Sequence, residues 1–417
     1  MKKVFVFIFF ILILGGGFYL YKNKKNNPNT PILSAIFPEG GFINPKKDDL
    51  KDIEGDVSSE ENPQISGENI TSNSKFKQLT TNPVAGYTSF NIEIKKDIPA
   101  DPNIPKSKPS SEIIKKHLLR YVSRASGYIY EISDGEIPLQ ISNIYIPNIY
   151  EAYFIDNNKT AILRHLRSDK KTIASYSLPI PEENTDGTRT QKDGLYLPEN
   201  IKSMAISPDT KSLVRLINYP NLTTVNTTSS TNTKNVEIFN SQLKEWLPFW
   251  SNQKIYLQTK ASYVSPGYLY QVDINKSLKR ILGDIKGLTV SISPSGNYII
   301  YSESVSNNIV LNILNTKDGS VQKTSLNVLP EKCTWLKNDD LICAGGGVPA
   351  GNYPDDWYMG TKSFSDNLYK IYTSTNIFDV IYDQSNSFDM TNLSLNENSS
   401  ILYFIDKNTG YLWSMKY

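Results

Sequence analysis

Short runs of alternating apolar and polar residues, separated by turn-forming clusters, fill the chain from about residue 75 to its end. Such alternation predicts half-buried β-strands, and no sustained helical period interrupts it. The clearest runs are SMAISPDTKSLVRLI (203–217) and VSISPSGNYIIYSES (290–304). Each predicts two strands joined by a tight turn, because Pro fixes φ while Gly or Asn tolerates positive φ.

These hairpins recur along the chain. Where nothing is inserted their spacing is about 43 residues, close to the period of a four-stranded propeller blade. An additional hairpin precedes them, with strands VAGYTSFNI and HLLRYVSRA on either side of a Pro-rich stretch (95–112) that we expect to be a loop. The pattern predicts an all-β fold, a seven-bladed β-propeller; six or eight blades, an open sheet array and two β-sandwiches are the alternatives. The turns centre near Asn157, Asp209, Asn252, Ser295, Asn338 and Asn398.

The last repeat, 392–417, has room for only three strands. A propeller ring closes when a strand from the other end of the chain completes the last blade, and KFKQLT (75–80) is well placed for this role. We therefore expect one propeller domain over residues 75–417, closed by a strand at 75–80 that pairs with the last blade.

The N-terminal region differs sharply from the rest. Residues 4–20 read VFVFIFFILILGGGFYL, an uncharged run of about the length that crosses the ~30 Å hydrocarbon core of a membrane. The run is longer than the apolar part of a signal peptide and lacks an A-x-A-like cleavage site, so an uncleaved anchor is favoured over a cleaved signal. We expect residues 1–25 to anchor the chain in the cell membrane by a single transmembrane helix, and residues 26–74 to be a flexible linker. Lysines flank the run on both sides, so charge hardly discriminates the orientation; we expect an extracytoplasmic propeller.

Composition excludes several classes of function. The chain has 44 Lys and Arg against 42 Asp and Glu, which gives no case for a nucleic-acid partner. Its two Cys and two His cannot supply the about four ligands of a structural zinc site. No G-x-S-x-G elbow or P-loop spacing occurs. We therefore expect no catalytic residue, no cofactor and no metal site, although scattered Asp and Glu leave acid/base chemistry unassigned.

Cys333 and Cys343 flank the turn of the sixth blade. A hairpin loop of odd length centred on Asn338 places them directly opposite each other, at a distance that suits a disulfide, whereas a two-residue loop points them to opposite faces. The bridge is favoured outside the cytoplasm; inside it, the alternative is two buried thiols.

The segment 345–364, GGGVPAGNYPDDWYMGTKSF, is the most distinctive insertion. Tyr353, Trp357 and Tyr358 could offer rigid amphipathic contact area to a partner, with Asp355 and Asp356 accepting hydrogen bonds or a cation. The alternative is that the aromatic rings pack this long loop onto the propeller.

Two resemblances follow from these residues. The strand–SPDG–strand pattern resembles the WD-like propeller repeats of the TolB type and of prolyl oligopeptidases. The stretch CTWLKNDDLICAGGGVPAGNYPDDWYMG (333–360) resembles membrane-anchored bacterial propeller proteins with a Cys-Trp strand and a YPxxWYxG loop. Both imply architecture and not an activity. The favoured interpretation is a membrane-tethered binding scaffold for a protein, peptide or cell-envelope polymer. The alternative is an envelope hydrolase or lyase with a carboxylate site at the propeller channel mouth.

Overall fold

The computed structural model describes residues 75–98, 110–133, 136–184, 187–273, 275–383, 388–396 and 398–417. The expected membrane anchor and linker, residues 1–74, lie outside these ranges. Among the residues that are described, no helix has the length and apolar character needed to cross a membrane.

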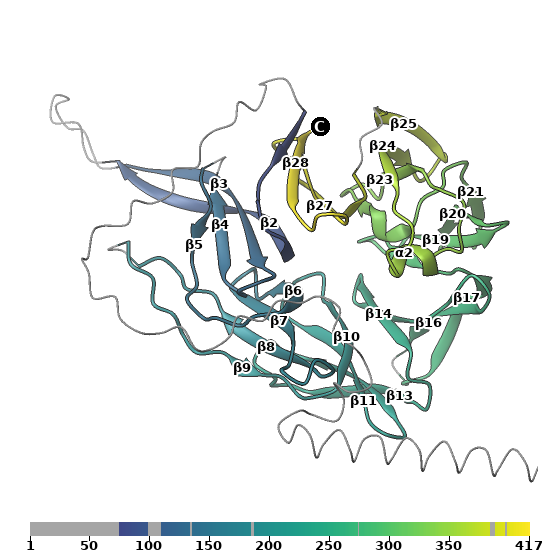
Figure 1. Cartoon of the computed structure of the whole chain (residues 1–417), viewed down its shortest axis with the longest axis horizontal. Helices are drawn as coiled ribbons and strands as arrows, with labels where there is room; N and C mark the ends of the chain where they lie inside the picture. Colours follow the sequence, from purple (N-terminus) through teal and green to yellow (C-terminus); the bar gives the residue numbers. More distant parts are fainter. Residues whose placement is uncertain are drawn as a thin grey trace, which may run out of the picture. The chain divides into compact units, whose positions relative to one another are not determined.

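Seven antiparallel four-stranded sheets are arranged around a common axis (Figure 1), which confirms the predicted all-β, seven-bladed propeller. The first four blades contain β2 (Val84–Ile98), β3 (Ser110–Ser123), β4 (Ile129–Ser133) and β5 (Leu139–Gln140); β6 (Ile149–Ile155), β7 (Thr160–Leu166), β8 (Ile173–Pro179) and β9 (Leu195–Tyr196); β10 (Ile201–Ile206), β11 (Leu213–Asn218), β12 (Thr223–Thr228) and β13 (Val236–Ser241); and β14 (Trp246–Ser251), β15 (Lys254–Thr259), β16 (Pro266–Val272) and β17 (Leu278–Lys286).

The remaining blades follow the same plan. They contain β18 (Val290–Ile292), β19 (Tyr298–Val305), β20 (Asn308–Asn315) and β21 (Val321–Lys323); β22 (Cys333–Trp335), β23 (Leu341–Gly347), β24 (Ser365–Tyr372) and β25 (Ile377–Tyr382); and β26 (Met390–Asn396), β27 (Ile401–Asp406) and β28 (Leu412–Lys416), joined by β1 (Phe76–Gln78). Two short helices, η2 (Pro330–Lys332) and α2 (Asp355–Tyr358), lie in connections.

The seventh blade takes its outermost strand from the beginning of the described chain. β1 runs antiparallel to β28, with Phe76 opposite Met415 and Gln78 opposite Trp413. The ring of Phe76 packs edge-on against Phe404 of β27, with ring centroids 6.0 Å apart. The two ends of the described chain are therefore held in one sheet.

The first hairpin of each blade forms where the turn chemistry predicts it. In the blade of β18 and β19, the backbone N–H of Ser293 donates to Tyr298 O and that of Gly296 donates to Ser293 O. Gly296 has a φ of 74°, a conformation that a side chain disfavours, so glycine suits this turn.

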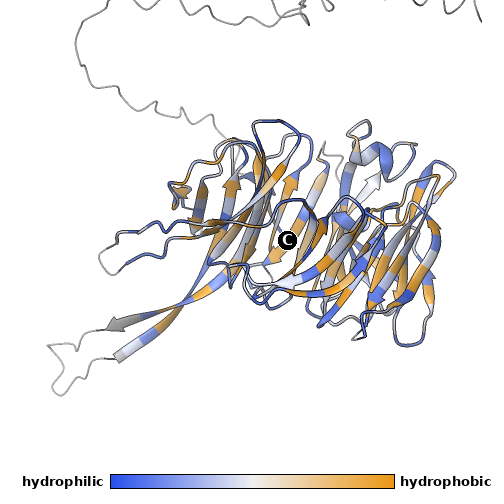
Figure 2. Cartoon of the chain, turned by 90° about the horizontal axis from the view of Figure 1, so that it is seen from below, coloured by the Kyte–Doolittle hydropathy of each residue, from blue (hydrophilic) through white to orange (hydrophobic). Residues whose placement is uncertain are grey.

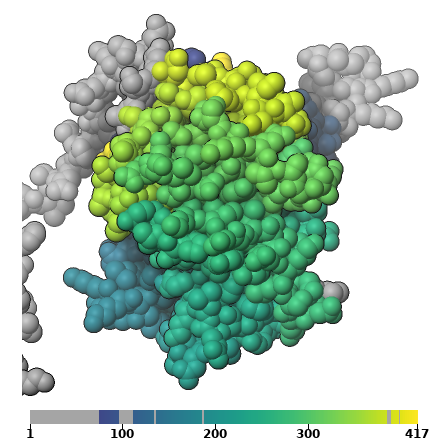
Figure 3. Space-filling model, turned by 90° about the vertical axis from the view of Figure 1, so that its right-hand side faces the viewer, coloured from purple at the N-terminus to yellow at the C-terminus, as the bar shows by residue number. Residues whose placement is uncertain are grey.

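An apolar cluster lies between each pair of neighbouring blades, and a further cluster lies under the β23–β24 connection. Consecutive residues of the second strand of a blade point to opposite neighbours: Leu163 packs against the first blade and Ile162 against the third. Both are fully buried, and each stabilises the fold by about 1.5–3 kcal/mol. Leu119 and Tyr403 belong to the cluster between the first and last blades, so the ring is closed by apolar packing as well as by strand pairing. In Figure 3 successive blades lie beside one another in sequence order.

The first hairpin extends far beyond its blade. β2 and β3 stay paired as far as Ile98 opposite Ser110, whereas β4 pairs with β3 only from Leu118 onward. Residues 91–98 and 110–117 thus form a two-stranded arm that leaves the blade (Figure 2). The loop expected over 95–112 is therefore shorter than predicted, because strand pairing continues up to the residue before Pro99 and resumes after Pro109.

Candidate functional site

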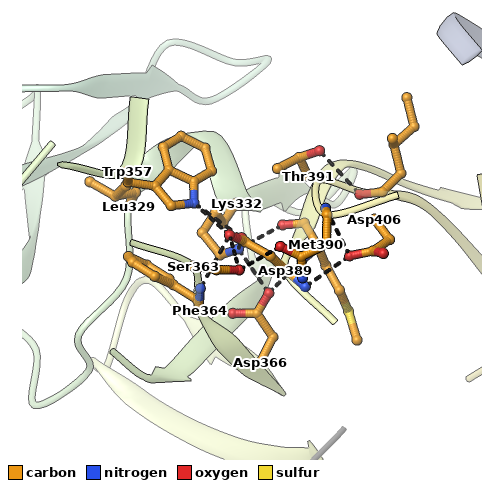
Figure 4. A network of polar contacts seen from close by, with 12 residues as sticks. Leu329, Lys332, Trp357, Ser363, Phe364, Asp366, Asp389, Met390, Thr391 and Asp406 are labelled. Carbon is orange, nitrogen blue, oxygen red and sulfur yellow. Dashed lines mark hydrogen bonds and ion pairs between the residues drawn. The ribbon is translucent and has the colours of Figure 1, made fainter. Parts of the chain in front are cut away.

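A buried ionic network joins the sixth and seventh blades (Figure 4). Its centre is Lys332, the last residue of η2 and fully buried, directly before the innermost strand of the sixth blade. Lys332 Nζ lies 2.8 Å from Asp366 Oδ2, 2.5 Å from Asp389 Oδ1 and 2.9 Å from the backbone oxygen of Met390. All three ammonium hydrogens therefore have acceptors, which a buried charge requires.

Asp389 is the second hub of the network. Besides Lys332, it accepts hydrogen bonds from Trp357 Nε1 at 3.0 Å, Ser363 Oγ at 3.1 Å and the backbone N–H of Phe364 at 3.1 Å. Its own backbone N–H donates to Asp406 Oδ1 at 3.1 Å. One carboxylate thus connects the seventh blade to α2 and to the C-terminal end of the segment that contains it.

Asp366 completes the network on β24. Burial raises the pKa of this carboxyl to about 6, because the loss of hydration outweighs the attraction of Lys332 and the hydrogen bond from the backbone N–H of Met390. Within the described residues its Oδ1 has no hydrogen-bond partner. The neighbouring Asp389 carboxylate shares the same ammonium, and its negative charge adds to the effect of burial on the pKa of Asp366.

Aromatic rings shield the lysine from water. Lys332 Nζ lies 4.9 Å from the ring centroid of Phe364 and 5.5 Å from that of Trp357, distances at which a cation is attracted to a ring face. Lys407 Nζ lies 5.0 Å from the Trp357 ring centroid. Tyr353, which is fully buried, packs edge-on against Phe364. The network is enclosed, so Lys332 acts as a structural ion.

The β23–β24 connection, residues 348–364, is held onto the propeller by this network. The hydroxyl of Tyr353 donates to Pro349 O, and the backbone N–H of Asn352 donates to Asp356 Oδ2 at 2.8 Å. Asp355 Oδ2 accepts a hydrogen bond of 2.7 Å from the backbone N–H of Tyr263, in the β15–β16 connection. Two connections from blades that are not adjacent are thereby joined.

The structure separates the predicted binding residues into two groups. Trp357 is only 4% exposed and Tyr353 is buried, so these two rings pack the connection onto the propeller, which is the alternative that the sequence left open. Asp355 and Asp356 accept hydrogen bonds from the protein's own backbone, as described above. Tyr358 is 47% exposed, and its hydroxyl donates to Glu331.

Four partly exposed residues with large side chains lie at α2 and in the connection bonded to it. Met359 is 67% exposed and Tyr358 follows the buried Trp357, while Tyr263 and Val264, 39% and 58% exposed, lie in the connection tied to α2 by Asp355. We call these four residues the α2 patch. Sequence reasoning missed Met359 and the whole of the Lys332 network, because nothing in the chain marks Lys332, Asp366 and Asp389 as neighbours.

The cysteines lie directly beside the network. Cys333 follows Lys332, and the five-residue loop 336–340 places it opposite Cys343 in the ladder of β22 and β23. The structure joins the two by a disulfide with Cα atoms 4.0 Å apart. The bridge braces the hairpin that positions Lys332.

Two carboxylates outside the Lys332 network, Glu331 and Glu182, are engaged by neighbouring side chains. No group of three His, Cys, Asp or Glu side chains within them is arranged to hold a metal ion. Glu331, next to the innermost strand of the sixth blade, is occupied by hydrogen bonds from Tyr358 and Thr289. A cavity of about 420 Å³ beside β8 contains Glu182, but this carboxylate is paired with Lys159 at 2.5 Å.

Comparison with known proteins concerns the fold. No protein-family model and no curated protein matches the chain. The chain is similar in structure to TolB from Acinetobacter baumannii, with 15% identity over 63% of this chain and 62% of TolB and a TM-score of 0.39; it thus spans less than two thirds of TolB. An oligogalacturonate lyase from Vibrio parahaemolyticus shows 10% identity over 79% of this chain and 98% of the lyase, with a TM-score of 0.47.

The β-propeller domain of the Trilobed protease from Pyrococcus furiosus shows 12% identity over 72% of this chain and 91% of that domain, also with a TM-score of 0.47. Similarity at this level carries no argument about activity, and the neighbours include both enzymes and TolB. The assignment of the fold rests on the seven sheets and their ring of apolar clusters. The chain is a seven-bladed β-propeller.

Proposed function

We propose that this protein is a binding scaffold that presents the α2 patch to a protein or peptide partner. The observation that carries this proposal lies within one turn of helix. Trp357 is buried against Lys332 and Asp389, whereas Met359 is 67% exposed and Tyr358, whose hydroxyl donates to Glu331, is 47% exposed. A contact surface that is already ordered loses less conformational entropy when a partner binds.

The composition of the patch supports a polypeptide partner. Tyr and Met are enriched at protein interfaces, because Tyr combines a large apolar area with a polar tip and Met adapts its shape. Tyr263 and Val264 extend this surface from a second blade. Propellers commonly bind through loops that vary while the ring stays rigid.

The proposal includes the setting of the propeller. Residues 4–20 would tether the chain to the cell membrane and the linker 26–74 would let an extracytoplasmic propeller reach its partner. Deletion of residues 2–25 should move the protein from the membrane fraction to the soluble fraction. Unchanged fractionation would count against the tether without affecting the patch.

Site-specific photocrosslinking tests the patch in intact cells. A photoreactive residue in place of Met359 should give a defined adduct that protease treatment removes, and the combined substitution Tyr358→Ser and Tyr263→Ser should reduce its yield. The same probe in place of Ile377, which is 60% exposed on the outermost strand of the sixth blade, is the matched control. Equal labelling at both positions, or an adduct that resists protease, would overturn a polypeptide partner at the patch.

A further inference from the structure

The arm of β2 and β3 has an unpaired edge. From Ser110 to Lys116 the side of β3 that faces away from β2 has no strand partner within the part of the chain that the structure describes. A two-stranded ribbon is only marginally stable in water on its own, and a free edge is a template for a further strand. The arm is therefore an element that a partner strand would complete.

Apolar side chains are exposed along this arm. Ile94 and Ile114 are directly opposite each other in the β2–β3 ladder and are 42% and 39% exposed, and Ile113 is 63% exposed on the other face. Lys115 pairs with Glu93 at 3.8 Å, so the ribbon also carries charge. Lysines on an edge strand disfavour pairing with most other strands. A strand that places acidic residues opposite these lysines is favoured over the rest.

The edge of β3 supplies those positions itself. When two copies of β3 pair antiparallel, the two-fold axis is perpendicular to the sheet, so each side chain and its symmetry copy lie on the same face. Residues that are directly opposite each other in the ladder also lie on the same face. The axis must therefore pass beside one residue, which is then directly opposite its own copy. With Ile114 at the centre, Glu112 opposes Lys116 of the second copy, and symmetry repeats this ion pair. Centring on Glu112 or Lys115 instead opposes like charges, and centring on Ile113 forms no ion pair.

The register around Ile114 also buries the exposed isoleucines. Ile94 and Ile114 of one copy would continue into Ile114 and Ile94 of the other, giving one apolar row across four strands. Opposite charges and β-branched pairs facing each other across strands both stabilise a sheet, and this register provides both at once.

We propose that two copies of this chain associate through the outer edge of β3, in an antiparallel two-fold register centred on Ile114. The occupant of the arm is thus a second copy of the protein. The resulting four-stranded sheet has the order β2, β3, β3 and β2, and it forms away from the α2 patch, because first hairpins and second-to-third strand connections emerge at opposite ends of a blade.

Charge exchange tests the register. In sedimentation velocity of the full chain in detergent, the wild type should dimerise, whereas Glu112→Lys and Lys116→Glu alone should each associate at least about tenfold more weakly, because both symmetric ion pairs become like-charge pairs. Mixing the two variants should restore dimers, since every opposed pair is then of opposite charge. Lys279→Glu, the same charge change on the edge strand β17, should leave association unchanged.

Cysteine crosslinking supplies an independent readout. Ile114→Cys should form a disulfide-linked dimer at least about tenfold faster than Ile113→Cys, because directly opposed Cβ atoms lie about 4.5–5.5 Å apart and diagonal ones farther. A wild type that stays monomeric up to about 100 μM, a mixture of charge variants that stays monomeric, or faster crosslinking at position 113 would each overturn the proposal.

Discussion

The indole Nε1 of Trp357 donates a hydrogen bond to Asp389 Oδ2 at 3.0 Å, although the two residues are 32 positions apart in the chain. Asp389 also holds Lys332, so the ring lies over a buried ammonium while its N–H satisfies that ammonium's counterion. Polar contacts in the interior of the propeller therefore hold α2 in place, and they also fix where the exposed residues of α2 lie.

Removing this hydrogen bond should destabilise the protein beyond the loss of ring volume. Trp357→Phe should lower the free energy of unfolding by about 1–3 kcal/mol more than Trp246→Phe, because it leaves a buried carboxylate short of one donor. Trp246 is a matched control: it is 5% exposed, and within the described residues its Nε1 has no partner. Urea unfolding measures both, and equal losses would show that the bond to Asp389 contributes nothing.

The stability of the protein should depend on the proton of Asp366. Its folded pKa of about 6 lies above the ~3.9 of an unfolded aspartate, so its contribution to stability is fully present below the unfolded pKa and is lost as the pH rises through about 6. The unfolding free energy of the wild type minus that of Asp366→Asn should fall by about 2 kcal/mol between about pH 4 and pH 7. Unfolding curves at intermediate pH values check this, and a difference that rises with pH contradicts it.

The bridge between Cys333 and Cys343 should stabilise the sixth blade. It closes a loop with a sequence separation of 10, for which the chain-entropy model gives about 3 kcal/mol. Reduction should therefore lower the unfolding midpoint, and the double substitution Cys333→Ala and Cys343→Ala should abolish the response to reductant. A midpoint that reductant leaves unchanged in the wild type would mean that the bridge does not stabilise the fold.

Because β1 closes the ring, its removal should destabilise the whole propeller and not the seventh blade alone. Deletion of Lys75–Thr80 removes β1 and exposes both the edge of β28 and the aromatic cluster around Phe76, so the whole domain should unfold in one transition at a lower temperature. Deletion of residues 2–25 is the control and should leave the transition in place. Calorimetry that shows only a minor early transition after removal of β1 would indicate that the blades are independent.

The sequence was sufficient to predict the blades, but it was not sufficient to predict the ionic network around Lys332. Turns such as the one at Gly296 are local, so proline, glycine and asparagine reveal them directly, and a regular spacing does the rest. Lys332, Asp366 and Asp389 come from three separate segments whose proximity exists only after two blades pack. A residue type alone does not show whether a lysine pairs inside or faces water.

The β23–β24 connection illustrates a second limit. Its composition identifies a loop rich in aromatic residues, but it does not show which rings are buried and which are exposed. In the short helix α2, neighbouring side chains point in different directions, so Trp357 is buried and Tyr358 is exposed. The division follows from backbone geometry that the insertion adopts only on the folded propeller.

The closing strand also decides how the molecule would respond to force. Six blades are built from continuous stretches of chain, whereas the seventh depends on β1, which contributes three residues to its ladder. Tension applied to the chain before Phe76 acts first on those few hydrogen bonds. The propeller therefore has a built-in mechanical seam, where it would open under load while the interfaces between its other blades are still intact.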